Sequence, residues 1–151
     1  MLVVMIATIS VWFTACSKDD KPDEDYLKSK IIGKKWYCYN LNPEDYISFR
    51  EDGTFTCKVE ATAFGGIYYD GMNINGMYSI REIEETELDG KKTTLFKMLA
   101  SGSNDFDQLW VYHFINRTDI IGISTYYIAV SFYSGNEFFR GLAFSDNAGG
   151  F

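Results

Sequence analysis

The sequence predicts an all-β domain that follows a short apolar leader and a charged tether. Three observations carry this prediction. The chain holds 12 Phe, 11 Tyr and 3 Trp but only two prolines, a composition that suits half-buried strands. Runs of alternating polar and apolar residues recur between turn signals. The first fifteen residues carry no charge, whereas the residues that follow are densely charged.

The leader, residues 1–15, has the features of a secretory signal peptide, because an apolar run ends in a small residue. It is shorter than the ~20 apolar residues that a membrane-spanning helix needs. The stretch Phe13-Thr14-Ala15-Cys16 resembles a bacterial lipobox. This resemblance implies cleavage after Ala15 and acylation of Cys16, so that a lipid anchor on Cys16 holds the protein at a membrane.

Residues 16–30 are predicted to form a flexible tether, since their low hydrophobicity and dense charge cannot support a core. Lys18-Asp19-Asp20 also resembles the export signal of surface-exposed lipoproteins in Bacteroidetes. That resemblance implies an outer-membrane protein that faces the exterior. The alternative is a generic solvated linker. The folded domain is expected to span residues 31–151.

The first hairpin is predicted from residues 45–59. Ile47 and Phe49 alternate with polar residues, which is the period of a half-buried strand. A three-residue loop with Gly53 in the left-handed conformation pairs Phe49 with Phe55 and Ile47 with Cys57. This register places the apolar side chains on one face.

Short motifs resemble the bacterial lipocalin-like domains found in Bacteroidetes lipoproteins. They are Gly33-x-x-Trp36, the ISFREDGTFT hairpin of residues 47–56, and Gly76-Met-Tyr78-Ser-Ile80. The resemblance implies an antiparallel, up-and-down, eight-stranded β-barrel with Trp36 at its closed end. It also implies that the barrel holds a small hydrophobic ligand.

Two further strand pairs are predicted along the chain. Residues 64–70 and 74–82 are expected to pair across a turn at 71–73. Asp89-Gly90 predicts a two-residue turn that places Glu87 opposite Lys92, Glu82 opposite Lys97 and Ile83 opposite Phe96. The acidic run 82–87 is therefore interpreted as a solvated strand face.

Residues 109–115 form a predicted strand that is apolar on both faces. Trp110, Tyr112 and Phe114 share one face, and His113 lies on the other. Such a strand is either covered on both sides or carries an exposed aromatic stripe.

The last hairpin is expected to turn at Gly135-Asn136 and to pair Phe132 with Phe139, Val130 with Gly141 and Ile128 with Ala143. Arg140 then lies opposite Ser131 on the outer face, where its guanidinium stays solvated. The side chains expected to line a ligand cavity are Trp36, Phe49, Phe55, Ile128, Val130, Phe132 and Phe139, with room left by the small residues Gly141 and Ala143.

Cys38 and Cys57 lie on the first and third predicted strands. In a meander these strands are ~9.6 Å apart, two strand spacings, whereas a disulfide needs Cα atoms within ~7 Å. This spacing favours buried thiols over a bridge, although an oxidising envelope would permit one.

Composition and motifs argue against several functions. A net charge of −7 repels nucleic acid and anionic lipid head groups. The only histidine is His113, so the chain lacks the parts of a histidine-containing metal site or nucleophile–histidine pair. We therefore expect no enzyme, no metal and no cofactor.

Two functions remain open. The first is a lipocalin-like barrel that binds a small hydrophobic ligand. The second is a module without a cavity that binds an envelope protein or a glycan through exposed aromatic residues. Tyr68-Tyr69 and the stripe at 110–114 are the candidate contacts for this second function.

Overall fold

The computed structural model describes residues 24–38, 44–64, 67–118 and 123–147. These ranges contain one helix and ten strands. The elements are α1 (Glu24–Lys30), β1 (Lys35–Cys38), β2 (Tyr46–Phe49), β3 (Thr54–Val59), β4 (Thr62–Phe64), β5 (Ile67–Tyr69), β6 (Met72–Leu88), β7 (Lys91–Ser101), β8 (Gln108–Thr118), β9 (Ile123–Ser134) and β10 (Glu137–Ser145).

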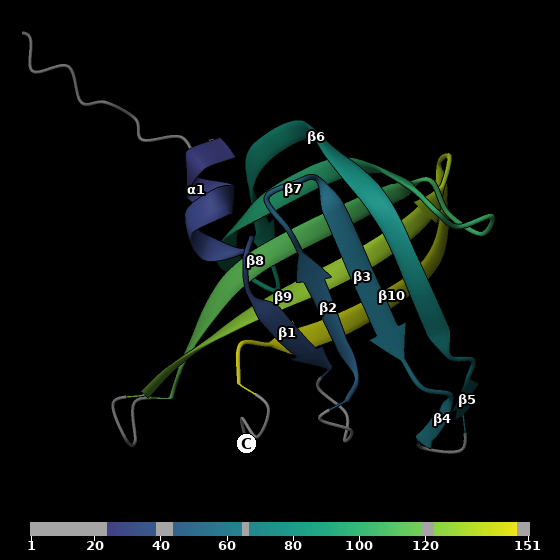
Figure 1. Ribbon diagram of the computed structural model, residues 1–151. Helices are drawn as coiled ribbons and strands as arrows, with labels where there is room; N and C mark the ends of the chain where they lie inside the picture. The colour runs from purple at the N-terminus through teal and green to yellow at the C-terminus, as the bar shows by residue number, and fades with distance from the viewer. Residues whose placement is uncertain (1–23, 39–43, 65–66, 119–122, 148–151) are drawn as a thin grey trace, which may run out of the picture.

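Eight of the strands form a closed antiparallel barrel, as Figure 1 shows. Each strand pairs with the next barrel strand along the chain, in the order β1-β2-β3-β6-β7-β8-β9-β10. The barrel closes where β1 meets β10, with Tyr37 opposite Ser145 and Cys38 opposite Phe144. Closure leaves no continuous free sheet edge around the barrel body. The predicted all-β, up-and-down, eight-stranded barrel is confirmed.

The β2–β3 hairpin has the predicted register. Phe49 lies opposite Phe55, and Ile47 lies opposite Cys57. Gly53 adopts a φ of 81°, and the Arg50 amide donates a 2.8 Å hydrogen bond to the Thr54 carbonyl. The alternation of side chains and one glycine with positive φ are sufficient to specify this hairpin.

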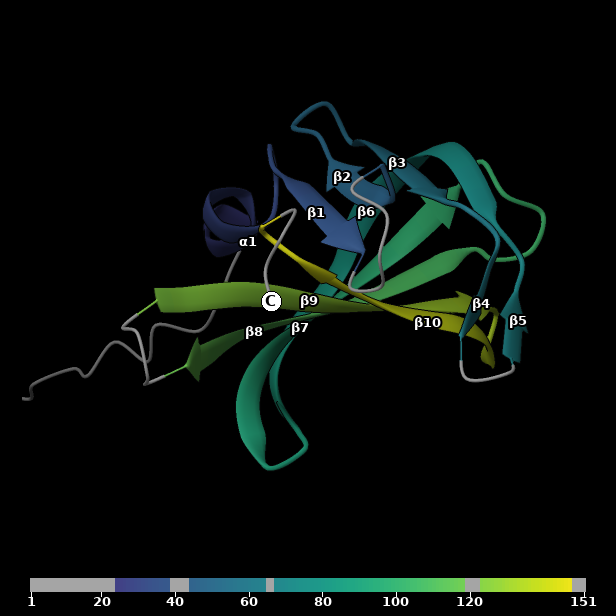
Figure 2. The same cartoon turned by 90° about the horizontal axis from the view of Figure 1, so that it is seen from below.

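The β6–β7 hairpin is also confirmed. Glu87 lies opposite Lys92, and the turn residues Asp89 and Gly90 have φ values of 50° and 75°. Figure 2 shows that the tip of this hairpin stands away from the barrel body.

The predicted pairing of residues 64–70 with 74–82 is wrong. The first of these segments lies in the small hairpin of β4 and β5, in which Thr62 lies opposite Tyr69. β6 already begins at Met72 and pairs with β3. A Cβ added to Gly71 would lie 2.9 Å from the Ala61 amide nitrogen. The absence of a Cβ at Gly71 therefore lets the backbone of Val59 and Ala61 come close to it. The predicted turn at 71–73 does not form.

The segment 24–30, expected to belong to the tether, forms helix α1, which lies beside the barrel near the start of β1 (Figure 1). Leu27 has no exposed surface and joins the barrel core, as does Ile31 just after the helix. Glu24 forms a 3.2 Å ion pair with Lys28 one turn later. Burial of Leu27 and Ile31 holds this segment against the barrel, although its charged composition predicted a linker.

Candidate functional site

Six of the seven side chains predicted to line a cavity lie together inside the barrel. They are Trp36, Phe49, Phe55, Ile128, Val130 and Phe132, and each has 0% of its surface exposed. All belong to one buried cluster. The inward alternation predicted for these strands is therefore correct.

The interior side chains contact one another. The ring centroids of Phe49 and Phe55 are 6.2 Å apart, and those of Phe106 and Phe132 are 4.9 Å apart. The Trp36 indole donates a 3.1 Å hydrogen bond to the Ile31 carbonyl. A side chain that lined a ligand-sized hollow would keep surface that a water-sized sphere could touch. These six keep none, so they form a packed core.

Phe139 does not belong to this group, because the predicted register of the last hairpin is wrong. The two-residue turn forms, but a bulge between Phe138 and Arg140 shifts the pairing that follows. Phe132 lies opposite Arg140, and Phe139 is 45% exposed. Phe139 instead stacks on Phe106, with centroids 6.4 Å apart.

The bulge also reverses which β10 residues face inward. Leu142 and Phe144 point to the core, whereas Gly141 and Ala143 are exposed. Burying leucine and phenylalanine removes more apolar surface from water than burying glycine and alanine. Arg140, expected outside, lies on the inner face and is half-buried, so its long stem can pass along apolar surface towards water.

The predicted cleavage and lipidation residues, Ala15 and Cys16, lie outside the described residues. The lipid anchor on Cys16 therefore stays a prediction.

His113 points into the barrel and is 4% exposed. Its ring lies 6.2 Å from Trp36 and 6.0 Å from Tyr126, measured between centroids. Burial, together with the positive charges of Lys30 and Lys34, lowers its pKa to about 4. A neutral imidazole among aromatic rings is a core side chain. Within the described ranges, no three His, Cys, Asp or Glu residues gather as they would around a metal ion.

Cys38 and Cys57 are not bridged to each other, which agrees with their predicted separation. Cys57 is fully buried, and burial raises its pKa to about 12. Its thiol is therefore protonated and unreactive at neutral pH.

The outer surface of β8, β9 and β10 has an unusual composition. Its outward residues alternate with buried inward ones, and none is charged. They are Gln108, Trp110 and Tyr112 on β8; Ala129, Ser131 and Tyr133 on β9; and Phe138, Gly141 and Ala143 on β10. We call this set the neutral face.

Cross-strand pairing arranges the neutral face in rows. Gln108, Tyr133 and Phe138 form the first row, and Trp110, Ser131 and Gly141 form the second. The third row consists of Tyr112, Ala129 and Ala143. Large aromatic side chains therefore dominate one end of β9 and β10, and alanines dominate the other.

The aromatic end of the neutral face is a continuous cluster. Trp110 and Tyr133 have ring centroids 4.5 Å apart, and Tyr133 meets Phe138 edge to face at 5.8 Å. Phe138 is 62% exposed and bends towards Gly141. Leu99 on β7, opposite Gln108, extends the cluster and is 46% exposed. Exposed apolar side chains that cluster in this way are often found at contact surfaces.

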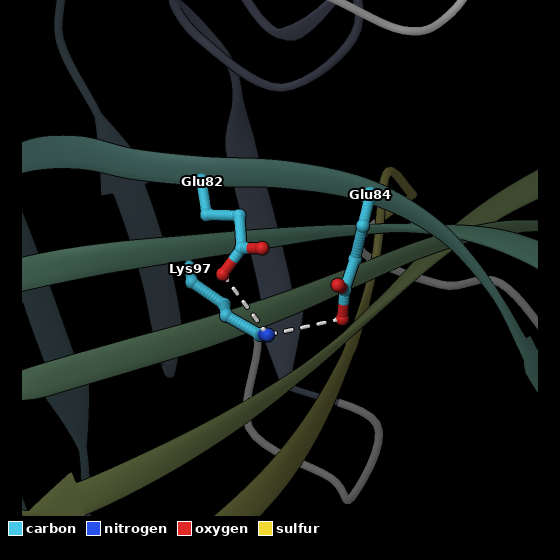
Figure 3. A network of polar contacts seen from close by, with 3 residues as sticks. All are labelled: Glu82, Glu84 and Lys97. Atoms are coloured by element: carbon cyan, nitrogen blue, oxygen red, sulfur yellow. Dashed lines mark hydrogen bonds and ion pairs between the residues drawn. The ribbon is translucent and has the colours of Figure 1, made fainter.

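Charges begin at the border of the neutral face, on β6 and β7. Lys97 lies between Glu82 and Glu84, with Nζ–O distances of 3.2 and 3.1 Å (Figure 3). Both carboxylates raise the pKa of Lys97. The same ammonium lies 5.0 Å from the Trp110 ring centroid. Lys97 therefore makes a cation–π contact with Trp110. Glu82 and Glu84 lie on the solvated strand face that was predicted for the acidic run 82–87.

The sequence predicted the Trp110–Tyr112 part of this surface but not its extension over Tyr133 and Phe138. The missing signal was the bulge, because the predicted register placed Gly141 and Ala143 inside. The other candidate contacts are Tyr68, Tyr69 and Phe114. Their side chains are not among those that the structure describes.

Comparison with family models, curated proteins and solved structures finds no match to this chain. The resemblance to lipocalin-like lipoproteins stays a prediction for that reason. Among the described residues, no helix is long and apolar enough to cross a membrane.

Proposed function

We propose that this protein is a non-catalytic interaction module that binds another protein chain on its neutral face. A lipid on Cys16, exposed by cleavage after Ala15, would anchor it to the outer membrane on the exterior side. The observation that carries the proposal is the uncharged, partly exposed aromatic surface of β8–β10 in a chain of net charge −7.

The packed interior favours this function over ligand carriage. An eight-stranded barrel either fills its interior with side chains or keeps room for one small ligand. The inward side chains Trp36, Phe96, Phe132 and Phe144 have no exposed surface. Binding of a small hydrophobic ligand stays a prediction, with less support than the interaction module.

The chemistry of the neutral face favours a protein over a glycan. A sugar presents many hydroxyl groups that need hydrogen-bonding partners. The neutral face offers no carboxylate or guanidinium, and the Gln108 amide already donates a 2.7 Å bond to the Gly135 carbonyl. Protein contact surfaces are enriched in Tyr, Trp and Phe and depleted in charge at their centre.

The test is site-specific photocrosslinking in native membranes. A photoreactive phenylalanine analogue replaces Phe138, which is exposed and already aromatic. We expect a covalent adduct with a protein after illumination. The matched control carries the same analogue at Asn73, an exposed β6 residue outside the neutral face, and should give none.

A parallel titration with a fluorescent fatty acid addresses the other function. The proposal predicts no saturable binding. Saturable binding together with no Phe138 adduct would contradict the interaction module and support ligand carriage.

A further inference from the structure

We propose that β6 pairs, along an edge that the barrel leaves open, with an extended and positively charged segment of another protein. This contact is separate from the neutral face and lies on the β6–β7 hairpin, whose tip stands away from the barrel body (Figure 2). Strand addition of this kind takes its affinity from main-chain hydrogen bonds and its specificity from side chains. Two observations carry the proposal: an edge with no strand beside it, and the single sign of the charges along that edge.

The free edge exists because β6 is longer than the strand on its β3 side. β3 pairs with β6 only as far as Met77, whereas β7 pairs with it as far as Leu88. Next to Met77, the Tyr78 amide donates a 2.8 Å hydrogen bond to the Gly53 carbonyl. In the part of the chain that the structure describes, residues 79–88 have no strand beside them on that side. The hairpin therefore presents one open strand edge.

The register of the hairpin shows which backbone groups face this edge. Both residues of the turn at 89–90 have positive φ, of 50° and 75°, as in a two-residue turn of the primed type. Leu88 and Lys91 flank this turn and are bonded to each other, and bonded and non-bonded pairs alternate from there along the hairpin. The amides and carbonyls that point away from β7 belong to alternate residues, namely Ile83, Glu85 and Glu87.

Carboxylates line the free edge on both faces of the hairpin. Glu82 and Glu84 lie on the outward face, where both contact Lys97. Glu85 and Glu87 lie on the opposite face and are exposed. None of the residues between Glu82 and Glu87 is basic. Opposite charges on adjacent strands stabilise the pair and like charges destabilise it, so an added strand with lysine or arginine on either face is favoured.

The same carboxylates argue against pairing between two copies of this chain. Two β6 edges placed side by side would bring glutamates next to glutamates. Charged side chains are a general protection of exposed edges against such pairing. Because the charges here have one sign, they disfavour acidic strands and leave a basic strand as the favoured occupant. No proline interrupts residues 79–88, so the edge keeps its backbone donors.

The test measures binding of a defined peptide to the full chain in a non-ionic detergent. The probe is a short fluorescent peptide of alternating lysine and threonine. One matched peptide has glutamate in place of lysine, and another is the lysine peptide methylated at its backbone nitrogens, which keeps the charge and loses the donors. Fluorescence anisotropy should show saturable binding of the lysine peptide and binding weaker by about tenfold or more for both matched peptides.

Hydrogen exchange followed by NMR locates the contact on the unaltered chain. At a lysine-peptide concentration of about ten times its Kd, exchange should slow by about tenfold at the amides that face the free edge. These amides belong to Ile83, Glu85 and Glu87. The amides of β8, β9 and β10 should exchange as they do without peptide.

Variants at Glu85 separate the backbone from the charge. Glu85→Pro removes an amide that faces the free edge and no bond to β7, so it should lower the affinity about tenfold and leave urea unfolding nearly unchanged. Glu85→Gln keeps the amide and should lower the affinity by less than about fivefold. Glu137→Gln, which removes an exposed carboxylate on β10, is the matched control and should have no effect.

Four results would overturn the proposal. The first is no saturable binding of the lysine peptide, and the second is equal binding of the methylated peptide, since charge alone would then explain the attraction. The third is equal binding of the glutamate peptide, which would contradict selection by charge. The fourth is slowed exchange on β8–β10 in place of β6. None of these results depends on the Phe138 adduct that tests the neutral face, so the two contacts succeed or fail separately.

Discussion

At the residue scale, Gly53 shows how one backbone conformation specifies a hairpin. Its φ of 81° is disfavoured for any residue with a Cβ. Space for a Cβ is available, because the nearest atom to it would be the Tyr78 carbonyl oxygen at 3.5 Å. Gly53→Ala should therefore destabilise the fold by about 1–2 kcal/mol through backbone strain alone. Gly53→Asn should cost less, because asparagine tolerates this conformation. Urea unfolding of both variants measures the difference, and equal losses would argue against strain.

His113 couples stability to pH. Its pKa is about 4 in the folded protein, against 6.5 for an unperturbed histidine. The unfolded chain therefore binds the proton more tightly, and protonation favours unfolding. The contribution of neutral His113 is fully present above pH 6.5 and is lost as pH falls towards 4. From the two pKa values it amounts to about 3 kcal/mol.

Urea unfolding at several pH values between 4 and 7 tests this coupling. The free energy of unfolding should fall with pH more steeply in the native sequence than in His113→Leu, which cannot titrate. Parallel pH profiles would show that other groups cause the decline.

At the element scale, α1 is expected to be part of the folded domain. Leu27 has no exposed surface, so Leu27→Ala should destabilise the protein by about 2–5 kcal/mol. Lys28→Ala, its neighbour on the exposed side, should cost less than about 0.5 kcal/mol, because it removes only a surface ion pair. Thermal or urea unfolding distinguishes the two, and equally small effects would indicate that the helix does not pack on the barrel.

The hairpins show which information the sequence holds. The β2–β3 and β6–β7 registers were predictable, because strict alternation and a turn with positive φ point to the same pairing. The start of β6 was not predictable from Gly71, since a glycine in a tight backbone approach resembles a glycine in a turn. Helix α1 was missed because the dense charge of residues 24–30 outweighs the apolar signal of Leu27.

The register of the β9–β10 hairpin was predicted wrongly for a different reason. Phe138 and Phe139 are both aromatic, so alternation does not indicate which of them faces inward. The bulge between Phe138 and Arg140 then moves every later side chain of β10 to the other face. Six of the side chains predicted to line a cavity do face inward, because their strands lack such a bulge, but they form a packed core. The neutral face was predicted only as far as β8.

At the scale of the whole molecule, the barrel wall separates an apolar interior, which stabilises the fold, from the neutral face, which is proposed to contact a partner. Phe132 is fully buried against Phe106 on the inside, whereas Phe138 is 62% exposed on the neutral face. Phe132→Ala should destabilise the fold by about 3–5 kcal/mol, since it leaves a hollow in the core. Phe138→Ala should cost about 1 kcal/mol or less, mainly its edge-to-face contact with Tyr133.

The same pair of variants separates the two surfaces functionally. Phe138→Ala should lower crosslinking to a partner chain in membranes while leaving stability nearly intact, because its side chain serves contact with that partner. Phe132→Ala should change stability and leave association of the folded fraction unchanged. Urea unfolding and chemical crosslinking of membrane-bound protein provide the two readouts. If Phe138→Ala instead destabilised the chain as much as Phe132→Ala, the Phe138 ring would be needed for folding. That result would contradict the neutral face as a contact surface.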